Sequence, residues 1–536
     1  MIYDLIIIGN GGAGLSAALE AKKSSSNILV VSKTHSTSSQ TSQAQGGINA
    51  VLNNNTDSID SHIQDTSKAG KKIESLETIK YMCENAKNTI QWLDTLGVPF
   101  SRNSDNNIAQ RNFGGASHPR TCYSSDYTGL KILHTLYDNC IKEGISFLNE
   151  HHLLSFIKEQ DDNTIKGINL LNIASGELSQ VFAKSVIIAS GGYAGLYHNY
   201  TTNSTSTTGE VLNAALDIGC ELENMEFIQF HPTSLKSNRI LISESARGEG
   251  GYLVDQHGKR FIDELKPRDE VSRAIYTKIE NGDKVYLDMR HLGLEHIKQT
   301  MPQEYQIVHD FTGLKLDVDL IEITPSAHYT MGGIKVDIDT KTNISNLFAC
   351  GESASNRVHG ANRLGGNSLL EIITFGRVAG KNAISQALNS TSFDTGKYTS
   401  LLEKEIEKIN HIHTLPNTIN FQEKKNLLGK KLFKHLGLFR NETDLLSLKN
   451  EIITLIQDTA HMGTSDKSNI YNTDLKEFIE FKNMLELSLL IVLSALNRKE
   501  SRGAHHRTDF LQSEKEYEYS TIAYKVDNTI KVELWK

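Results

Sequence analysis

The sequence predicts an α/β fold, and three features carry that prediction. Within residues 2–23, a short apolar strand runs into a glycine-rich turn and an alanine-rich helix. From about residue 222 to 331, histidines, arginines and carboxylates gather around short apolar pieces. After about residue 393 the chain becomes Lys- and Glu-rich with a helical pattern. We therefore expect a Rossmann-like nucleotide-binding domain, an inserted α+β capping domain and a C-terminal helical domain.

The first element is a buried strand over residues 3–8, and it ends at a glycine turn. Gly9 allows the tight turn, Gly11 lets the backbone approach a pyrophosphate, and Gly14 lets the next helix pack close to the strand. That helix, expected over 15–23, points its free N–H groups at the phosphates. Such a turn can exist without a ligand, but the flanking strand and helix are the context that a dinucleotide site requires. The expected contacts in this turn are Gly9, Gly11, Gly12, Ala13 and Gly14.

The second strand, expected over 27–31, indicates which dinucleotide is bound. It ends in Ser32 and Lys33, where an NAD site would place an Asp or Glu. We expect Ser32 and Lys33 to contact the cofactor. A later segment, 343–352, reads as a strand closing on Gly351 and Glu352, an arrangement that commonly completes a flavin site. We therefore expect a Rossmann-like FAD-binding domain. Two further glycine-rich segments suit close backbone approach to the cofactor, Gln45-Gly46-Gly47 and Ser190-Gly191-Gly192, although the polar stretch 34–60 around the first is also typical of a flexible loop.

The remaining elements follow from hydrophobic periodicity. Helices are expected over 77–96 and 128–143, and strands over 165–171 and 185–189. After the insertion, 332–337 and 347–380 return to the nucleotide-binding sheet, and 520–535 forms a β-like tail. The predicted domains are 1–221 with 332–392 for FAD binding, 222–331 for the cap, 393–505 for the helical domain, and 506–536 for the C-terminal tail.

Composition excludes several classes of protein. The 536 residues exceed what one hydrophobic core supports. Lys and Arg number 56 against 64 Asp and Glu, a net charge of −8 without a basic block, so we expect no nucleic-acid partner.

No apolar run reaches the length of a membrane span, and 485–496 is expected to be a packed helix. The first strand leaves no room for a signal peptide, which predicts a cytoplasmic protein.

The five cysteines are dispersed without a C-x-x-C pair. This pattern favours reduced core thiols over disulfides, zinc or iron–sulfur ligation, so no metal is expected. Any electron relay beyond the flavin must then lie on another chain or a diffusible donor.

The candidate substrate-binding residues lie between positions 231 and 363, in the expected cap and in the segment that follows it. His231 and His328 stand in polar surroundings, and either alone could be an ordinary hydrogen-bonded histidine. Arginines lie in three nearby motifs, at Arg247, Arg268 and Arg363. Because a guanidinium matches carboxylate geometry, arginines and histidines beside a flavin indicate an anionic substrate, most naturally a dicarboxylate. The alternative is that these arginines form structural salt bridges.

Ordered motifs along nearly the whole chain resemble the flavoprotein subunit of the succinate dehydrogenase and fumarate reductase family, which includes L-aspartate oxidase. Besides the N-terminal glycine motif, the matching segments are 44–48, 111–115, 230–233, 247–250, 328–333, 359–363 and 500–505.

The resemblance implies roles for individual residues. The substrate is held by His231, Ser243, His328 and Arg363 between the flavin and the cap, with Phe113 beside it. Arg268 transfers the proton, relayed by Glu244 and Arg247, while hydride passes between flavin N5 and a substrate carbon. The further cofactor contacts that it implies are Gln40, Gln45, Gly46, Gly47, Ser190, Gly191, Glu352, Ser368 and Leu369.

Two departures from the family pattern bear on the branch. Membrane-bound members attach FAD through a histidine where this chain has Gln40, so we expect non-covalent FAD. Aspartate oxidases carry a glutamate where this chain has Phe113, and a phenyl ring offers a substrate ammonium no negative partner. The alternative is that Phe113 packs beneath the Gly114-Gly115 turn and another acidic residue binds the ammonium.

We therefore expect an FAD-dependent oxidoreductase that interconverts fumarate and succinate, with fumarate reduction the favoured direction. The resemblance also implies an iron–sulfur partner subunit, through which the chain would lie peripherally on the inner membrane. The alternatives are L-aspartate oxidase, which makes iminoaspartate for NAD synthesis, and a non-catalytic flavin-binding subunit.

Overall fold

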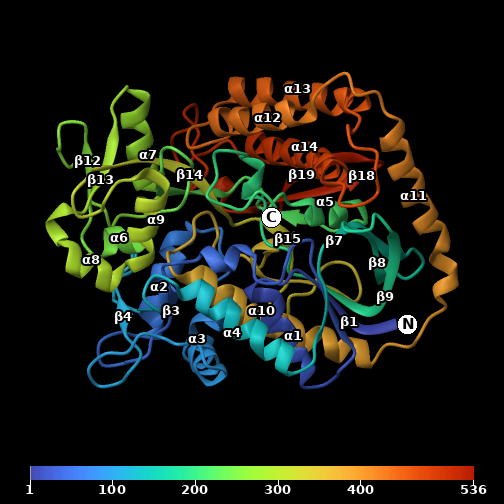
Figure 1. Ribbon diagram of the computed structural model, residues 1–536, viewed down its shortest axis with the longest axis horizontal. Coiled ribbons are helices and arrows are strands. Elements are labelled where there is room, and N and C mark those ends of the chain that lie inside the picture. The colour runs from blue at the N-terminus through green and yellow to red at the C-terminus, as the bar shows by residue number, and fades with distance from the viewer. Residues whose placement is uncertain (1, 536) are drawn as a thin grey trace.

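The computed structural model describes residues 2–535 and places a largely parallel sheet at the centre of the FAD-binding part (Figure 1). The strand order is β6-β2-β1-β9-β8-β7, and β16 also pairs with β9. The pairs of β1 with β2 and β9, β2 with β6, and β16 with β9 are parallel. The strands are β1 (Ile2–Ile8), β2 (Ile28–Val31), β6 (Ser146–Leu148), β7 (His151–Glu159), β8 (Thr164–Asn172), β9 (Leu178–Ile188) and β16 (Leu347–Ala349).

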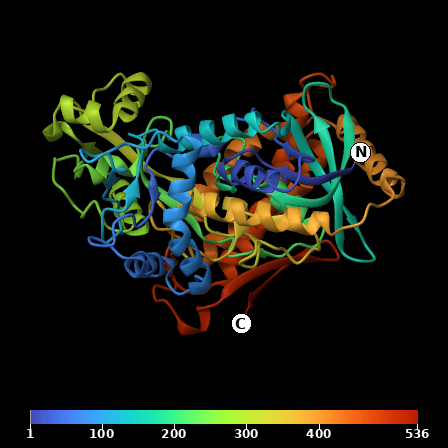
Figure 2. The ribbon, with the colours of Figure 1, turned by 90° about the horizontal axis from the view of Figure 1, so that it is seen from below.

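Among the helices near this sheet, α1 and α10 lie directly against it and run side by side (Figure 2). Glycine allows the close approach, because a Cβ at Gly380 would lie 2.2 Å from the Ala17 carbonyl oxygen. α3 begins at the Ser75 cap and ends at Gly97, whose φ is +103°. The helices are α1 (Gly12–Lys22), α2 (Ile59–Gly70), α3 (Leu76–Leu96), α4 (Thr128–Lys142) and α10 (Asn367–Leu388).

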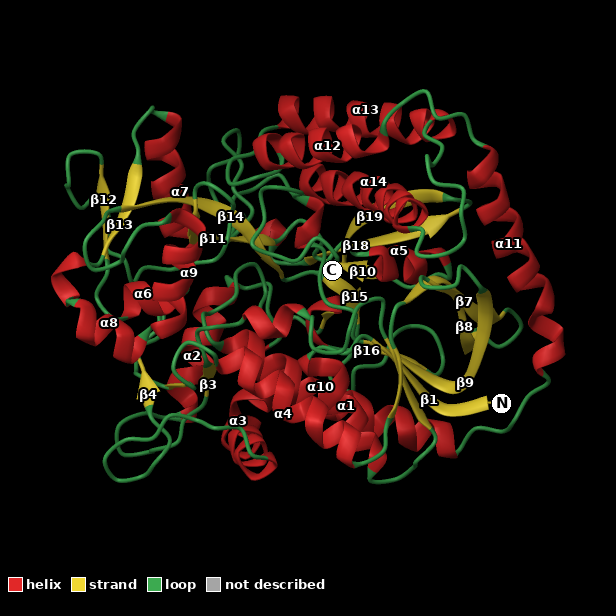
Figure 3. Ribbon diagram, in the orientation of Figure 1, coloured by secondary structure: helices red, strands yellow, loops and turns green. Residues whose placement is uncertain are grey.

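A four-stranded antiparallel sheet and its helices form the cap region, set apart from the central sheet (Figure 3). The strand order is β11-β14-β13-β12, and the core behind it includes Leu253, Val271 and Leu287. The elements are β11 (Ile228–Leu235), α6 (Glu244–Gly248), β12 (Tyr252–Asp255), α7 (Arg268–Glu280), β13 (Val285–Asp288), α8 (Leu294–Thr300), α9 (Pro302–Thr312) and β14 (Ile321–Thr330).

The C-terminal part combines four long helices with a hairpin. Residues 485–496 lie in the packed helix α14, as the sequence predicts. The hairpin β18–β19 extends a sheet of order β17-β15-β10-β18-β19. No helix within residues 2–535 has both the length and the apolar character needed to cross a membrane. The elements are α11 (Thr399–Thr414), α12 (Phe421–His435), α13 (Glu442–Asp458), α14 (Thr473–Asn497), β18 (Ser520–Val526), β19 (Thr529–Trp535), β10 (Leu222–Glu223), β15 (Gly333–Lys335) and β17 (Ala354–Ser355).

Two short pieces complete the scaffold of the site. A small sheet joins β3 (Ile48–Asn49), β5 (Thr121–Cys122) and β4 (Gln110–Arg111), and α5 (Glu210–Asp217) follows the loop after β9. The predicted domain divisions stay predictions. At the expected boundary near 222, β10 pairs with β15 and with β18 of the tail. Residues 1 and 536, the outer ends of the first and last predicted domains, lie outside the described residues.

Candidate active site

A large cavity lies at the carboxyl ends of β1, β2 and β9, the edge of an α/β sheet where dinucleotides bind. The space outside protein atoms is about 1570 Å³ when the open solvent at its mouth is included, and it continues from the glycine turn to the arginines and histidines of the cap region. One cavity thus joins the predicted cofactor residues to the predicted substrate residues.

The glycine turn has the geometry that a dinucleotide requires. Gly9 has a φ of +111°, and a Cβ there would lie 2.1 Å from the Ala189 carbonyl oxygen. Gly14 does not line the cavity, because its role is packing: a Cβ there would lie 2.0 Å from the Gly9 carbonyl oxygen. Gly191, with a φ of +82°, has open space where its Cβ would be. These backbone positions leave room for a pyrophosphate at the start of α1.

Unsatisfied polar atoms around the cavity support the fit to FAD. Within the described residues, Asn10 Nδ2, Gln45 Oε1 and Ser190 Oγ are buried without a hydrogen-bond partner. α10 begins after Gly366, whose φ is +80°, and no side chain caps its first turn; the Asn367 N–H donates to the Leu364 carbonyl oxygen at 3.3 Å. Every predicted cofactor residue except Gly14 lines the cavity: Gly9, Gly11, Gly12, Ala13, Ser32, Lys33, Gln40, Gln45, Gly46, Gly47, Ser190, Gly191, Glu352, Ser368 and Leu369.

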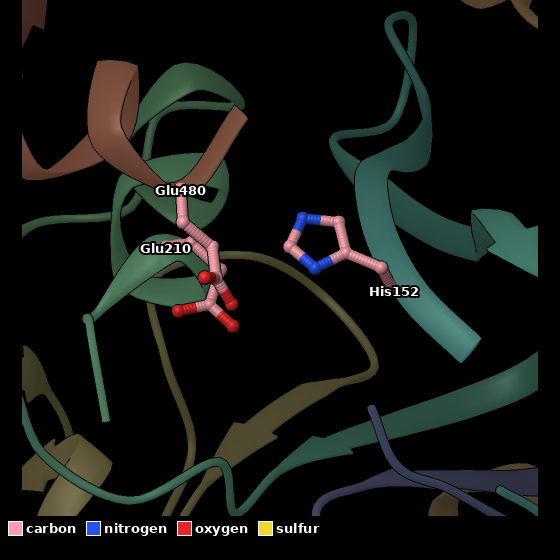
Figure 4. A group of neighbouring side chains, drawn as sticks. All are labelled: His152, Glu210 and Glu480. Atoms are coloured by element: carbon pink, nitrogen blue, oxygen red, sulfur yellow. The ribbon is translucent and has the colours of Figure 1, made fainter. Parts of the chain in front are cut away.

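Lys33 lies in an ion cluster that the sequence did not reveal. Its Nζ is 2.5 Å from Glu210 Oε1 and 2.8 Å from Glu480 Oε1, and Lys476 lies 3.4 Å from Glu480. Figure 4 shows the imidazole of His152 facing the same two carboxylates. Two ammonium groups balance the two carboxylates, so the cluster has no excess negative charge to attract a metal ion. Glu210, which also lines the cavity, was missed because it comes from α5, far from Lys33 in the sequence.

The two predicted histidines meet on adjacent strands of the cap sheet. His231 on β11 and His328 on β14 have ring centroids 4.9 Å apart. Their Nδ1 atoms contact the Thr233 carbonyl oxygen at 3.0 Å and Thr202 Oγ1 at 2.8 Å, respectively. Burial, reinforced by the charge of Arg268, holds the pKa of both histidines well below the usual value. Both rings are therefore neutral at pH 7.

Arg268 and Arg363 converge on one side-chain oxygen. Arg268 Nη1 and Arg363 Nη2 each donate to Gln229 Oε1 at 3.2 Å. The amide of Gln229 is oriented in turn, because its Nε2 donates to Asn362 Oδ1 and to the Arg363 carbonyl oxygen, both at 2.8 Å. Gln229 is a site residue that sequence reasoning missed, and its only signal is its position two residues before His231.

Glu244 is the carboxylate partner of this arginine pair. Its Oε2 accepts from Arg268 Nε at 2.7 Å, and its Oε1 accepts from the Gly114 N–H at 3.1 Å. Although burial acts to raise it, the charges of Arg268 and Arg247 bring the pKa of Glu244 below its usual value. Arg247 lies behind Glu244, at 3.6 Å, and does not line the cavity. The structure thus brings the three predicted proton-relay residues into one chain of contacts.

Ser243 and Phe113 complete the cavity wall. Ser243 caps α6, since its Oγ accepts from the Ser245 N–H at 3.2 Å. Phe113 is 4% exposed and packs against Gly46, where a Cβ would lie 2.4 Å from the phenyl Cζ. Burial, together with the charge of Arg268, lowers the pKa of Arg363 to about 10, so the Arg363 guanidinium group stays positive at pH 7. The wall therefore presents positive donors and neutral histidines, which suits a dianionic ligand.

Comparison with known proteins identifies the family. The FAD binding domain family matches residues 4–369, and the fumarate reductase flavoprotein C-terminal family matches residues 425–536. An 8-methylmenaquinol:fumarate reductase flavoprotein subunit of Wolinella succinogenes is 37% identical, over 95% of this chain and 86% of the relative. The chain belongs to the fumarate reductase and succinate dehydrogenase flavoprotein family. The family prediction is thereby confirmed, and with it FAD as the cofactor and an oxidoreductase as the class of enzyme.

Other members of the flavoprotein family are similar to this chain over nearly its full length, in sequence and in structure. A succinate dehydrogenase flavoprotein subunit of Rickettsia bellii is 36% identical, over 99% of this chain and 94% of the relative. A solved structure of Escherichia coli quinol fumarate reductase has a TM-score of 0.95 at 32% identity, and covers 100% of this chain and 96% of its own. The predicted fold class, a Rossmann-like FAD-binding domain with an α+β cap and a helical C-terminal part, is confirmed.

Proposed function

We propose that this flavoprotein interconverts fumarate and succinate. The observation that carries the proposal is the pair of guanidinium groups, Arg268 and Arg363, which share the acceptor Gln229 Oε1 and line the same cavity as the two neutral histidines. This arrangement offers hydrogen-bond donors for the two carboxylates of the substrate. It also places one positively charged group, Arg268, for proton transfer at one of the two carbons between them.

Each residue then has a defined task. FAD, when bound, supplies the hydride acceptor or donor at flavin N5. Arg363, His231, His328 and Ser243 hold the substrate carboxylates, which fixes the orientation of the central carbons. Arg268 gives a proton to the carbon adjacent to the one that exchanges hydride, or takes it in the reverse direction. In fumarate reduction, Arg268 regains the proton that it has given away from Arg247 through the ionised Glu244; in succinate oxidation, the proton moves from Arg268 through Glu244 to Arg247.

One experiment separates this function from its alternatives. The purified protein is assayed for fumarate-dependent oxidation of a reduced dye, and for anaerobic bleaching of the flavin by succinate and by L-aspartate. We expect activity with fumarate and succinate and none with L-aspartate, because Phe113 stands where a carboxylate would be needed for the ammonium group. Bleaching by L-aspartate alone, with iminoaspartate formed, would assign the protein to the oxidases.

We propose that FAD is held without a covalent bond. Gln40 lines the cavity, and its Oε1 accepts from the Ser204 N–H at 2.9 Å. An amide side chain cannot form the bond that a histidine would make. Acid precipitation should therefore release all the yellow chromophore, and flavin retained in the pellet would refute the proposal.

We also propose that the chain exchanges electrons with an iron–sulfur subunit. Through that subunit the chain would lie on the cytoplasmic side of the inner membrane as a peripheral protein. All five cysteines are buried and unpaired, which supports placing the cluster ligands on another chain. Purification from native membranes through a tagged chain should recover a second polypeptide that contains iron and acid-labile sulfide. Recovery of the flavoprotein alone, with full activity towards a quinol, would refute this assignment.

A further inference from the structure

Two buried carboxyl groups meet beside the substrate wall, and the proposed reaction uses neither. Glu304 lies in the first turn of α9 in the cap region, and Asp126 lies just before α4 in the FAD-binding part. Both residues are fully buried. Asp126 Oδ2 accepts from the Glu304 N–H at 2.8 Å, so the two carboxyl groups lie on opposite sides of the junction between these two parts of the chain.

Glu304 is bonded directly to the start of α6. Its Oε1 accepts from the Ser243 N–H at 2.6 Å. Ser243 is a proposed substrate contact, and the helix that it caps carries Glu244 and Arg247 of the proton relay. The position of the Glu304 carboxyl group therefore determines where these side chains lie relative to the cavity.

Asp126 belongs to a segment that is hydrogen-bonded to Ala44 and Gln45 in the wall of the cofactor cavity. Two residues after Asp126, the hydroxyl of Thr128 donates to the Gln45 carbonyl oxygen at 3.4 Å, and the Gly129 N–H donates to the Ala44 carbonyl oxygen at 2.7 Å. Hydrogen bonds, linked by the short chain segment from Asp126 to Gly129 and by the Glu304 residue itself, thus connect Ala44 and Gln45 to Ser243.

The protonation state of this pair follows from its surroundings. Glu304 Oε2 and Asp126 Oδ1 are buried without a hydrogen-bond partner within the described residues. Burial, and then the charge of Asp126, raises the pKa of Glu304 to about 8, while burial raises the pKa of Asp126 to about 6. The charge of Arg111 opposes both shifts, and Glu249 and Tyr123 face Arg111 in turn. At pH 7, Glu304 is therefore neutral and Asp126 is ionised.

We propose that Glu304 is a positioning residue that fixes the start of α6 against the FAD-binding part of the chain, and that it does so only in its neutral form. When Glu304 ionises, two negative charges face each other in a buried junction. Their repulsion, together with the cost of a buried charge, displaces α9 from Asp126 and Ser243 from the substrate. The cap region therefore binds the substrate more weakly as the pH rises.

The test compares the FAD-loaded full chain with three variants. E304Q keeps an acceptor oxygen for Ser243 and replaces the carboxyl O–H with an amide N–H, but it cannot ionise. E304A removes the acceptor. E295Q removes one acidic charge from an exposed position on the neighbouring helix α8 and is the matched control.

The kinetic measurement rests on the proposed function. We expect the KM for fumarate to rise about tenfold between pH 7 and 9 in the parent and in E295Q, as one hydrogen bond is lost. In E304Q the KM for fumarate should match the parent value at pH 7, within about twofold, and should not change between pH 7 and 9. In E304A it should be raised by about tenfold throughout. An E304Q profile as steep as that of the parent, or an E304A KM equal to the parent value at pH 7, would overturn the proposal.

The stability measurement does not depend on the substrate. Between pH 4.5, the ordinary pKa of the group, and about 8, the folded chain keeps a proton on Glu304 that the unfolded chain has lost. The free energy of unfolding should therefore fall as the pH rises through this window, and fall less in E304Q. Identical pH dependence of the urea midpoint in E304Q and the parent would overturn the proposal. Absence of fumarate activity with the E304Q difference intact would refute the proposed function alone.

Discussion

Arg268 is the residue on which the proposed proton transfer depends. It begins α7, lines the cavity and contacts Glu244, but it lies outside the glycine-rich cofactor region. R268A should therefore lower kcat by about a hundredfold to ten-thousandfold, since a positioned proton donor is lost, while FAD stays bound. Turnover by dye reduction and the visible flavin spectrum measure the two effects.

The control for R268A is R290A. Arg290 is an exposed arginine of the same cap region, and its ion-pair partner among the described residues is Asp288. R290A should keep parent kcat, since exposed pairs contribute little. Near-normal turnover in R268A with an intact flavin spectrum would show that the proton takes another route.

Gln229 allows a second test at the residue scale. Its one acceptor oxygen serves two buried guanidinium groups, so Q229L leaves both without that partner. Because hydrogen bonds to charged groups contribute about 1.5–3 kcal/mol, kcat/KM for fumarate should fall by roughly tenfold to a hundredfold. Steady-state kinetics measure this, with Q256L at an exposed turn as the control. If Q229L and Q256L behave alike, the arginines do not need the shared acceptor.

At the scale of elements, the crossing of α1 and α10 controls the cofactor cavity. Both helices begin at the cavity, and Gly380 brings them into backbone contact. G380V places a side chain where a Cβ would already lie 2.2 Å from the Ala17 carbonyl oxygen. We expect a loss of about 1–3 kcal/mol in the free energy of unfolding, and weaker FAD retention, because the helix starts move apart.

Urea denaturation and flavin content after gel filtration measure the effect of G380V. S385V, at an exposed position of α10, makes a comparable β-branched substitution away from α1 and should leave both quantities near the parent values. Equal stability of the two variants would mean that the helices can separate without cost.

At the scale of the whole molecule, a buried ion network ties the C-terminal tail to the rest of the chain. Arg498 lies 2.6 Å from Glu226 and 2.9 Å from Glu500, and its Nη2 donates to the Tyr519 carbonyl oxygen at 2.7 Å. All three charged residues are fully buried. R498M leaves two buried carboxylates without their shared partner, which should cost about 3–5 kcal/mol of stability.

Thermal and urea unfolding test this expectation. K72M removes the exposed Lys72–Glu518 pair, which also joins the tail to the FAD-binding part, and should cost less than about 1 kcal/mol. An R498M loss no larger than that of K72M would show that the network does not hold the tail.

Much of the fold could be predicted from the sequence because its signals are local. Gly9 and Gly14 stand at spacings that only a strand, tight turn and close helix satisfy, and β1, α1 and β2 lie where these spacings place them. The order of motifs along the chain likewise predicted the family. Long periodic segments such as 77–96 and 128–143 are helices because their apolar faces are continuous within the segment.

The tertiary structure alone decided which distant side chains share a site. Gln229 meets Arg363 across 134 positions of the sequence, and Glu210 meets Lys33 across 177. Glu304 accepts from Ser243 across 61 positions, and no pattern around Glu304 distinguishes it from an exposed glutamate at the start of a helix. The sequence by itself determined the cofactor fold and the family, because these depend on short-range spacing. Packing decided how the ionisable groups are paired and which of them are neutral. The pKa of a group depends on its burial and its partners, and these come from residues that are distant in the sequence.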